Sequence, residues 1–355
     1  MSEKSVADES TKLKQNLWPA SVMLALGFSS GLPYLLIYDT ASVWLRQAGV
    51  SLADIGYFFL FTTFSYTLKF LWAPVIDRLN LPFLTRHLGH RRGWLLLIQG
   101  LLVAGLLGIS FSHPERGIVG MVIIASLTGF IAATQDIVMD AWRIEAVEEK
   151  LQGLMASCYQ WGYRISMILS GVLPLILSKP LGWNMAYAVM AAFMAVGIAA
   201  VLLAPREKAH TIRPIHMEGL TPQPWREALE WTTRGILIVL AAILMGCGLT
   251  GNVDVLDFLL GLVGLSDQAQ QALKAIWTAK ATGVFLQIPA FLIGFGLLAA
   301  CCLPLPWATR PGAYFKGAFV APVADFFQRY ENWAAFILAL ILVYRVSEFV
   351  LNIMN

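Results

Sequence analysis

The residues best suited to chemistry lie in the segment Ile131–Glu145, which has the sequence IAATQDIVMDAWRIE. This segment ends a long apolar run that begins at Gly117. Asp136, Asp140 and Arg143 follow one another at i, i+4 and i+7, so a helix would present all three on one face. A charged side chain inside a bilayer costs about 2.5–3.5 kcal/mol on the insertion scale. A chain that accepts this cost repeatedly on one face is expected to have a water-filled path or a partner charge there.

Two interpretations of these charges remain open. Asp140 and Arg143 fit a helix that simply ends at the lipid headgroups, where charge costs little. Gln135 and Asp136 lie deeper in the apolar run, so a functional role is favoured for them. A carboxyl group removed from water favours its uncharged form, which makes Asp136 and Asp140 candidate proton carriers.

The composition indicates an all-α membrane protein with several spans. Of its 355 residues, 58% are hydrophobic and 13% are charged, and the mean hydropathy is +0.67. Soluble domains carry roughly 25% charged residues. The net charge of +3 gives no reason to expect nucleic acid, and the polar start of the chain lacks the features of a signal peptide. The cysteines and histidines show no metal-ligand spacing, so we expect no metal, no cofactor and no catalytic residues.

About 20 apolar residues are needed for each helical crossing of a bilayer. On this rule we expect nine spans, at Trp18–Leu45, Ile55–Val75, Trp94–Phe111, Gly117–Trp142, Leu154–Leu177, Trp183–Ala204, Gly235–Leu249, Gly283–Leu303 and from Trp333 to near the end of the chain. With the N-terminus inside, the inner tail and loops hold 17 Lys and Arg residues and the outer loops hold five. The positive-inside rule therefore predicts a cytoplasmic N-terminus.

The first predicted span contains features of close helix packing and of a helix break. Gly27 and Gly31 form a GxxxG pair, and Pro33 removes a backbone hydrogen bond shortly afterwards. Discontinuous helices near the middle of a membrane are typical of transport sites. Plain close packing is the alternative. Tyr38 follows near the outer end of the span.

Further charges surround the second span and its loop. Lys69 lies one turn inside the span, and it either extends to the interface or takes part in a gate at the cytoplasmic side. Asp77 and Arg78 follow at the inner mouth, and Arg91 and Arg92 precede the third span. Positive-inside charge explains the arginines but does not explain Asp77.

The fifth and ninth spans each carry an arginine. Arg164 has apolar neighbours, lies next to Tyr163, and is expected to pair with Asp136 or Asp140 because a short loop joins the fourth and fifth spans. Arg345 and Glu348 form a similar pair at i, i+3 in the ninth span.

The chain resembles the major facilitator superfamily, and within it the AmpG-type muropeptide permeases and their acetyl-CoA-transporter relatives. The resemblance rests on the strings GFSSGLP, KFLWAPVIDR with HRRGW, ATQDIVMDAW, GYRISMILSG and DFFQRYENWAAFILALILVYRVSEF. It implies a proton-coupled importer of N-acetylglucosaminyl-anhydromuropeptides in the inner membrane, whose partners are the lipid bilayer, a small-molecule substrate and protons. It implies two six-helix bundles around a central cavity.

The resemblance also assigns candidate roles to individual residues. The candidates for substrate binding are Gly31, Tyr38, Gln135, Tyr163 and Arg164. The candidates for proton coupling are Asp136, Asp140 and Glu348. The candidates for a cytoplasmic gate are Lys69, Asp77, Arg78, Arg91 and Arg92.

The predicted domains depart from that family pattern. We expect a cytoplasmic tail (1–17), an N-terminal six-helix bundle (18–204), a linker (205–234), an inserted helix pair (235–304), a cytoplasmic loop (305–332) and the first helix of a truncated second bundle (333–355). Because alternating access needs two halves, we expect a fragment, a truncated product or half of an assembly that a second chain completes. The alternatives are a facilitator for another anionic solute such as an acyl-CoA, and a membrane-embedded acyl or glycosyl transferase.

Overall fold

The computed structural model describes residues 3–67, 69, 72–205, 220–251, 253, 260–261, 264, 266–279, 282–303, 309–341 and 343. Within these residues the regular structure is entirely helical, as predicted. The chain forms two compact units, Met1–Ile212 and Arg213–Asn355, which are described separately. The predicted domain boundaries remain predictions.

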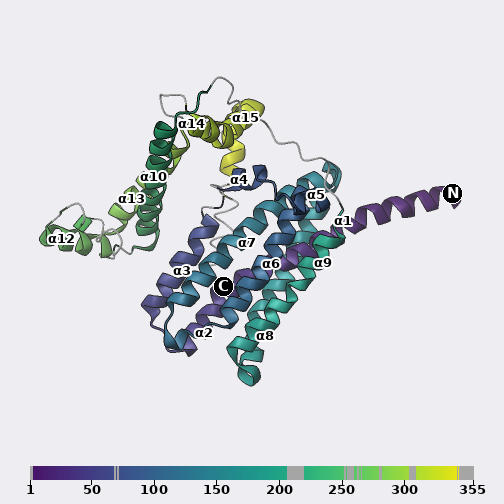
Figure 1. Cartoon of the computed structure of the whole chain (residues 1–355), viewed down its shortest axis with the longest axis horizontal. Helices are drawn as coiled ribbons and strands as arrows, with labels where there is room; N and C mark the ends of the chain where they lie inside the picture. The colour runs from purple at the N-terminus through teal and green to yellow at the C-terminus, as the bar shows by residue number, and fades with distance from the viewer. Residues whose placement is uncertain are drawn as a thin grey trace. The chain divides into compact units, whose positions relative to one another are not determined.

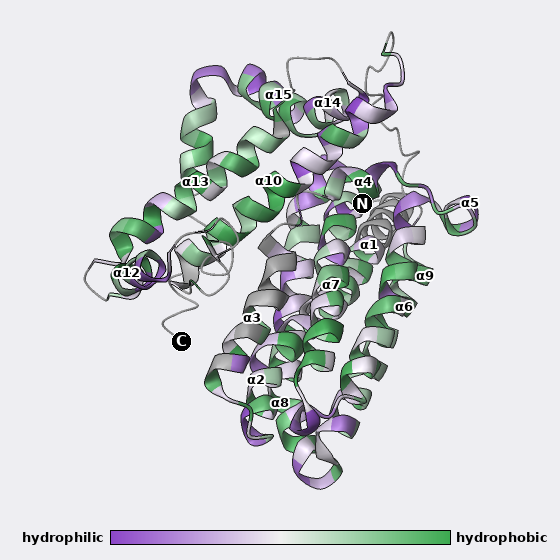
Figure 2. Cartoon of the chain, turned by 60° about the vertical axis from the view of Figure 1, so that its left-hand side comes forward, coloured by the Kyte–Doolittle hydropathy of each residue, from purple (hydrophilic) through white to green (hydrophobic). Residues whose placement is uncertain are grey.

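The first unit is a bundle of long helices that lie side by side (Figure 1). They are α1 (Glu3–Leu35), α3 (Leu52–Thr67), α6 (His90–Ser110), α7 (Val119–Ala146), α8 (Gln152–Phe193) and α9 (Ala195–Leu203). Its core includes the fully buried side chains of Leu26, Trp142 and Tyr187. Figure 2 shows hydrophobic residues along the helices and hydrophilic residues at the helix ends and connecting turns, as expected for a bundle in lipid.

The first predicted span contains a local change of helix type rather than a full break. After α1 come a π-helical segment, η1 (Leu36–Thr40), and then α2 (Ala41–Gln47). Pro33 lies one turn before η1 and cannot donate a backbone hydrogen bond. A π segment accommodates such a defect within a continuous helix, and these segments occur frequently at functional sites.

Helix α8 contains the fifth predicted span and the first half of the sixth, which continues into α9. Its 42 residues would extend about 63 Å at 1.5 Å per residue, about twice the thickness of a bilayer's hydrocarbon core. Gly182 interrupts it with φ 78°, a left-handed conformation that glycine adopts without steric cost. The chain reverses there. Hydrogen bonds from Asn184 to the Ser110 carbonyl and from Arg92 to the Val201 carbonyl show that α6 and the following segment are antiparallel.

The second predicted span is divided in the structure. Helix α3 ends at Thr67, Lys69 lies in a 3-10 turn, and α4 (Ala73–Arg78) begins with Pro74 in its first turn. Proline is favoured at the start of a helix and disfavours helical geometry in the residue before it. The remaining connections are α5 (Leu84–Leu88), η3 (Pro114–Arg116) and η4 (Glu149–Leu151).

The second unit is built on a pair of contacting helices, α10 (Pro224–Thr250) and α13 (Val284–Cys302), with α12 (Asp267–Thr278) between them in sequence. Helix α10 begins well before the predicted Gly235, because Pro224 initiates a helix that nothing interrupts. The expected loop after α13 is also largely helical. It contains α14 (Arg310–Phe315), η5 (Lys316–Val320), α15 (Ala321–Tyr330) and η6 (Glu331–Trp333).

Six helices in the described part of the chain are long and apolar enough to cross a membrane. One of them, Glu149–Leu203, has 55 residues and accounts for two of the predicted spans. The second predicted span is not among the six, and its helix α3 has 16 residues in the described part of the chain. The ninth predicted span lies largely outside the described residues.

Candidate functional site

Asp136 lies at the centre of a polar cluster formed by four helical segments of the first unit. Its carboxylate is 3.6 Å from the Lys69 ammonium, and it accepts a 2.6 Å hydrogen bond from the Ser30 hydroxyl. The Tyr159 hydroxyl also donates to it at 3.4 Å and lies 3.1 Å from the Ser30 hydroxyl. The Asp136 side chain is 19% exposed and the Lys69 side chain 40%. The charge pair is therefore partly shielded, yet solvent still reaches it.

This arrangement is suited to binding an anion and to transferring a proton. A carboxylate with one ammonium and two hydroxyl partners can lose its charge and leave the ammonium free for another anion. Lysine is a compact point charge with three donors, which suits carboxylate recognition. Lys69 therefore lies next to Asp136, and its role in a cytoplasmic gate remains a prediction.

A second polar cluster lies deeper in the same bundle. The buried Ser29 hydroxyl accepts hydrogen bonds from the amides of Gln99 at 2.8 Å and Gln135 at 3.0 Å. Both glutamines are fully buried, and their amide oxygens have no partner among the described residues. The neighbouring pairs Ser29–Ser30 on α1 and Gln135–Asp136 on α7 thus make parallel contacts, one inside the bundle and one at the charge pair.

Tyrosine rings surround the exposed side of the Asp136 cluster. Tyr34 lies 5.0 Å from Tyr38, 5.8 Å from Tyr66 and 6.3 Å from Tyr163, measured between ring centroids. Tyr163 in turn lies 5.9 Å from Tyr159, which hydrogen-bonds to Asp136. All five rings are partly exposed. Tyr38 and Tyr163 were predicted from the sequence to bind substrate, and the structure places them in one aromatic group.

Two of the predicted gate residues, Asp77 and Arg91, form a separate cluster near the C-terminal end of α7. The buried Arg91 guanidinium donates to Asp77 at 2.6 Å and to Glu145 at 2.8 Å. Arg92 instead donates to the carbonyls of Val201 and Leu202 at the end of α9. Arg78 hydrogen-bonds to the Pro74 carbonyl within its own helix. Asp77 and Arg91 are therefore in direct contact, with Glu145 as an additional partner, and their role in a gate remains a prediction.

The structure does not support the expected pairing of Arg164. Arg164 is exposed and makes no ion pair with any described residue, while Asp136 pairs with Lys69 and Asp140 with Arg143 at 3.3 Å. A short loop between two helices does not determine which of their faces meet, and the α7 face that carries Asp136 is directed toward α1 and Lys69.

Two other predicted residues have clear positions. Gly31 is buried where α1 crosses α8, and a Cβ there would overlap Ser166 and the Tyr163 carbonyl, so we assign it to helix packing. Glu348 lies outside the described residues, as does Arg345. The sequence analysis did not identify Ser30, Gln99, Glu145 or Tyr159.

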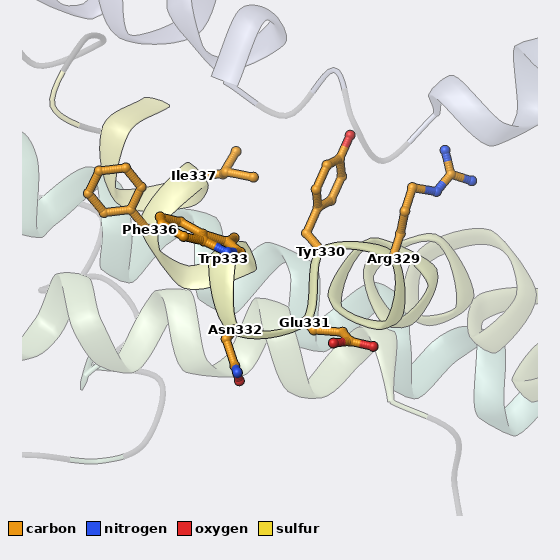
Figure 3. A pocket seen from close by; sticks show the side chains of 7 residues that line it. All are labelled: Arg329, Tyr330, Glu331, Asn332, Trp333, Phe336 and Ile337. Atoms are coloured by element: carbon orange, nitrogen blue, oxygen red, sulfur yellow. The ribbon is translucent and has the colours of Figure 1, made fainter.

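A shallow hollow in the second unit provides no comparable chemistry. It lies where α15 passes into η6, and its lining includes Arg329, Tyr330, Glu331 and Asn332. In Figure 3, Tyr330 and Arg329 point to one side of the chain and Glu331 and Asn332 to the other. Their polar groups do not converge on a ligand.

A sequence profile described as Major Facilitator Superfamily matches residues 17–343. The chain belongs to the major facilitator superfamily. Its apolar helices and its membership make it a multi-pass membrane protein of a transporter superfamily rather than of an enzyme family, as predicted. The Lys69–Asp136 pair is a partly shielded charge pair within a helical bundle of this superfamily member.

The chain is similar to permeases of the AmpG type. It is 33% identical over 291 residues to the anhydromuropeptide permease of Escherichia coli K12, covering 79% of this chain and 58% of the relative. It is 35% identical over 173 residues to the putative transporter AmpG 4 of Rickettsia felis, covering 48% of this chain and 41% of the relative. It is 34% identical over 192 residues to the putative transporter AmpG 3 of Rickettsia prowazekii, covering 54% and 45%. The chain thus spans about half the length of these relatives.

Proposed function

We propose that the protein imports N-acetylglucosaminyl-anhydromuropeptides across the inner membrane together with protons, with its N-terminus in the cytoplasm. The named activity of the Escherichia coli relative supports this substrate class. The observation that carries the proposal is the Lys69–Asp136 pair, in which an acid and a cation share one partly shielded site.

The proposed mechanism uses exchange of partners at this site. Protonation of Asp136 removes its charge and frees the Lys69 ammonium. A substrate carboxylate then takes the place of Asp136 as the counter-ion of Lys69. Ser30 and Tyr159 hold the carboxyl group in position through their hydroxyls. Release of the substrate carboxylate restores the original pair and expels the proton.

The proposed cytoplasmic gate is the cluster of Arg91, Asp77 and Glu145. One buried guanidinium pairs with two carboxylates, one from α4 and one from α7, so separating these helices would break two charge-assisted contacts. We assign Arg92 to holding α6 against the end of α9, because its donors are directed to backbone carbonyls.

The test combines binding and uptake. Radiolabelled anhydromuropeptide would be offered to the purified protein in nanodiscs and to vesicles at two external pH values. We expect binding by the unaltered protein, loss of pH-dependent uptake with Asp136→Asn, and retention with the control Asp140→Asn, whose side chain is 60% exposed. Absence of binding to the unaltered protein would overturn the substrate assignment. Equal pH dependence in both variants would overturn the role of Asp136.

A second chain in the transport path is a separate proposal. Purified protein in liposomes would be compared with vesicles from cells that express it beside other membrane proteins. Uptake only in the cellular vesicles would support a second chain, whereas equal uptake by the purified protein would contradict it.

A further inference from the structure

We propose that the five tyrosines beside Asp136 form a subsite for a pyranose ring, which deepens the proposed function and rests on it. The group consists of Tyr34, Tyr38, Tyr66, Tyr159 and Tyr163. It draws on three regions of the sequence that are brought together only in the folded bundle.

The rings form one continuous surface with Tyr34 at its centre. Tyr34 contacts Tyr38 and Tyr163 in tilted geometries and Tyr66 edge-on, at 87°. Tyr38 extends the surface by stacking on Phe59, with their planes 3° apart. Tilted, edge-on and stacked pairs of this kind stabilise an aromatic cluster without any ligand, so the surface is formed in advance.

The hydroxyl groups distinguish this cluster from aromatic packing elsewhere in the bundle. The buried Tyr187, for example, donates its hydroxyl to the Leu36 carbonyl at 2.7 Å. By contrast, the hydroxyls of Tyr34, Tyr66 and Tyr163 make no hydrogen bond within the described part of the chain. The three residues are partly exposed, so their hydroxyls are open to water and available to a ligand.

A sugar ring matches both properties of the surface. A pyranose has an apolar face of C–H groups, which packs on an aromatic ring, and a rim of hydroxyls and amides, which pair with phenols. A cationic ligand fits less well, because the nearby Asp136 charge is already matched by Lys69. The same site would then hold a sugar on the tyrosines and a carboxylate at Lys69, which are the two ends of an amphipathic glycopeptide.

The test separates the sugar from the peptide. The probes are the disaccharide N-acetylglucosaminyl-anhydro-N-acetylmuramic acid and the free stem peptide, each competing with labelled anhydromuropeptide for the purified protein. We expect the disaccharide to compete, and Tyr34→Phe, Tyr66→Phe and Tyr163→Phe each to weaken it about fivefold to tenfold, the effect of one lost hydrogen bond. These variants keep the ring packing. Tyr330→Phe, at a partly exposed tyrosine of the second unit, is the matched control and should change nothing.

The outcomes distinguish this inference from the proposed function. If the anhydromuropeptide binds but the disaccharide does not compete, or the three variants bind it as the unaltered protein does, the subsite is overturned and the proposed function stands. If the anhydromuropeptide does not bind, the proposed function falls, and direct binding of chitobiose decides the subsite. If chitobiose binds and Tyr34→Phe weakens that binding, the sugar subsite is supported. If chitobiose does not bind, or if tetramethylammonium alone displaces it, the sugar subsite is overturned.

Discussion

At the scale of single residues, the contact between Lys69 and Asp136 is a partly shielded ion pair in the first unit. Removing one member of a shielded charge pair leaves the other without compensation, whereas removing both does not. We therefore expect Asp136→Asn and Lys69→Gln to destabilise the protein singly and the double variant to recover part of the loss. The coupling should be about 1 kcal/mol, because Lys69 is 40% exposed.

Unfolding in a mixed-micelle series, followed by circular dichroism, would measure this coupling through a double-mutant cycle. The same cycle on Asp140 and Arg143 is the control, and it should give a smaller value because Asp140 is 60% exposed. A coupling near zero for Lys69 and Asp136 would show that the two charges do not stabilise each other.

The sequence identified the acid of this site but not its partner. Asp136 stood out because a charge within an apolar run is costly, and that argument needs no fold. Its partner depends on which helix faces meet, so proximity along the chain favours Arg164, whereas the fold brings Lys69 to the acid. Glu145 was also missed, although an acid at the end of α7 near a basic loop was a usable signal.

At the scale of elements, the crossing of α1 and α8 depends on glycine. A Cβ on Gly162 would overlap the Leu24 carbonyl, which is backbone and cannot move aside cheaply. We expect Gly162→Ala to destabilise the protein by about 1–3 kcal/mol, the range for overpacking.

Gly153 provides a control for this substitution on the same helix. A Cβ at Gly153 would meet nothing within 4 Å, so Gly153→Ala should be neutral or slightly stabilising through helix propensity. Thermal unfolding of both variants in one detergent would compare them. Equal unfolding temperatures would refute the close approach at Gly162.

Several features of the helices, including a close crossing and a local defect, could be predicted from sequence patterns. The GxxxG pair at Gly27 and Gly31 does lie where α1 meets α8, and Pro33 does precede a defect in the first span. The division between α3 and α4 was not predicted, because hydropathy averages over a window and hides a local break. The spacing of the tyrosines also indicates the cluster. Tyr34 and Tyr38 are spaced i, i+4, as are Tyr159 and Tyr163, so each pair shares one face of its helix.

At the scale of the whole molecule, the proposed orientation can be tested with single cysteines. In a variant whose four native cysteines are replaced by alanine, Glu115→Cys and Glu149→Cys place thiols in exposed turns at opposite ends of the bundle. The positive-inside rule predicts that an impermeant maleimide reacts with Glu115→Cys in intact cells and with Glu149→Cys only after lysis. The reverse pattern would place the N-terminus outside.

The parallel contacts of Ser29 with Gln135 and Ser30 with Asp136 have a mechanical consequence. Successive side chains on a helix point about 100° apart, so these two hydrogen bonds join α1 to α7 in different directions. A rotation of α1 about its own axis, or a sliding of α1 along α7, would break both hydrogen bonds. We therefore expect α1 and α7 to resist moving separately while both hydrogen bonds are in place.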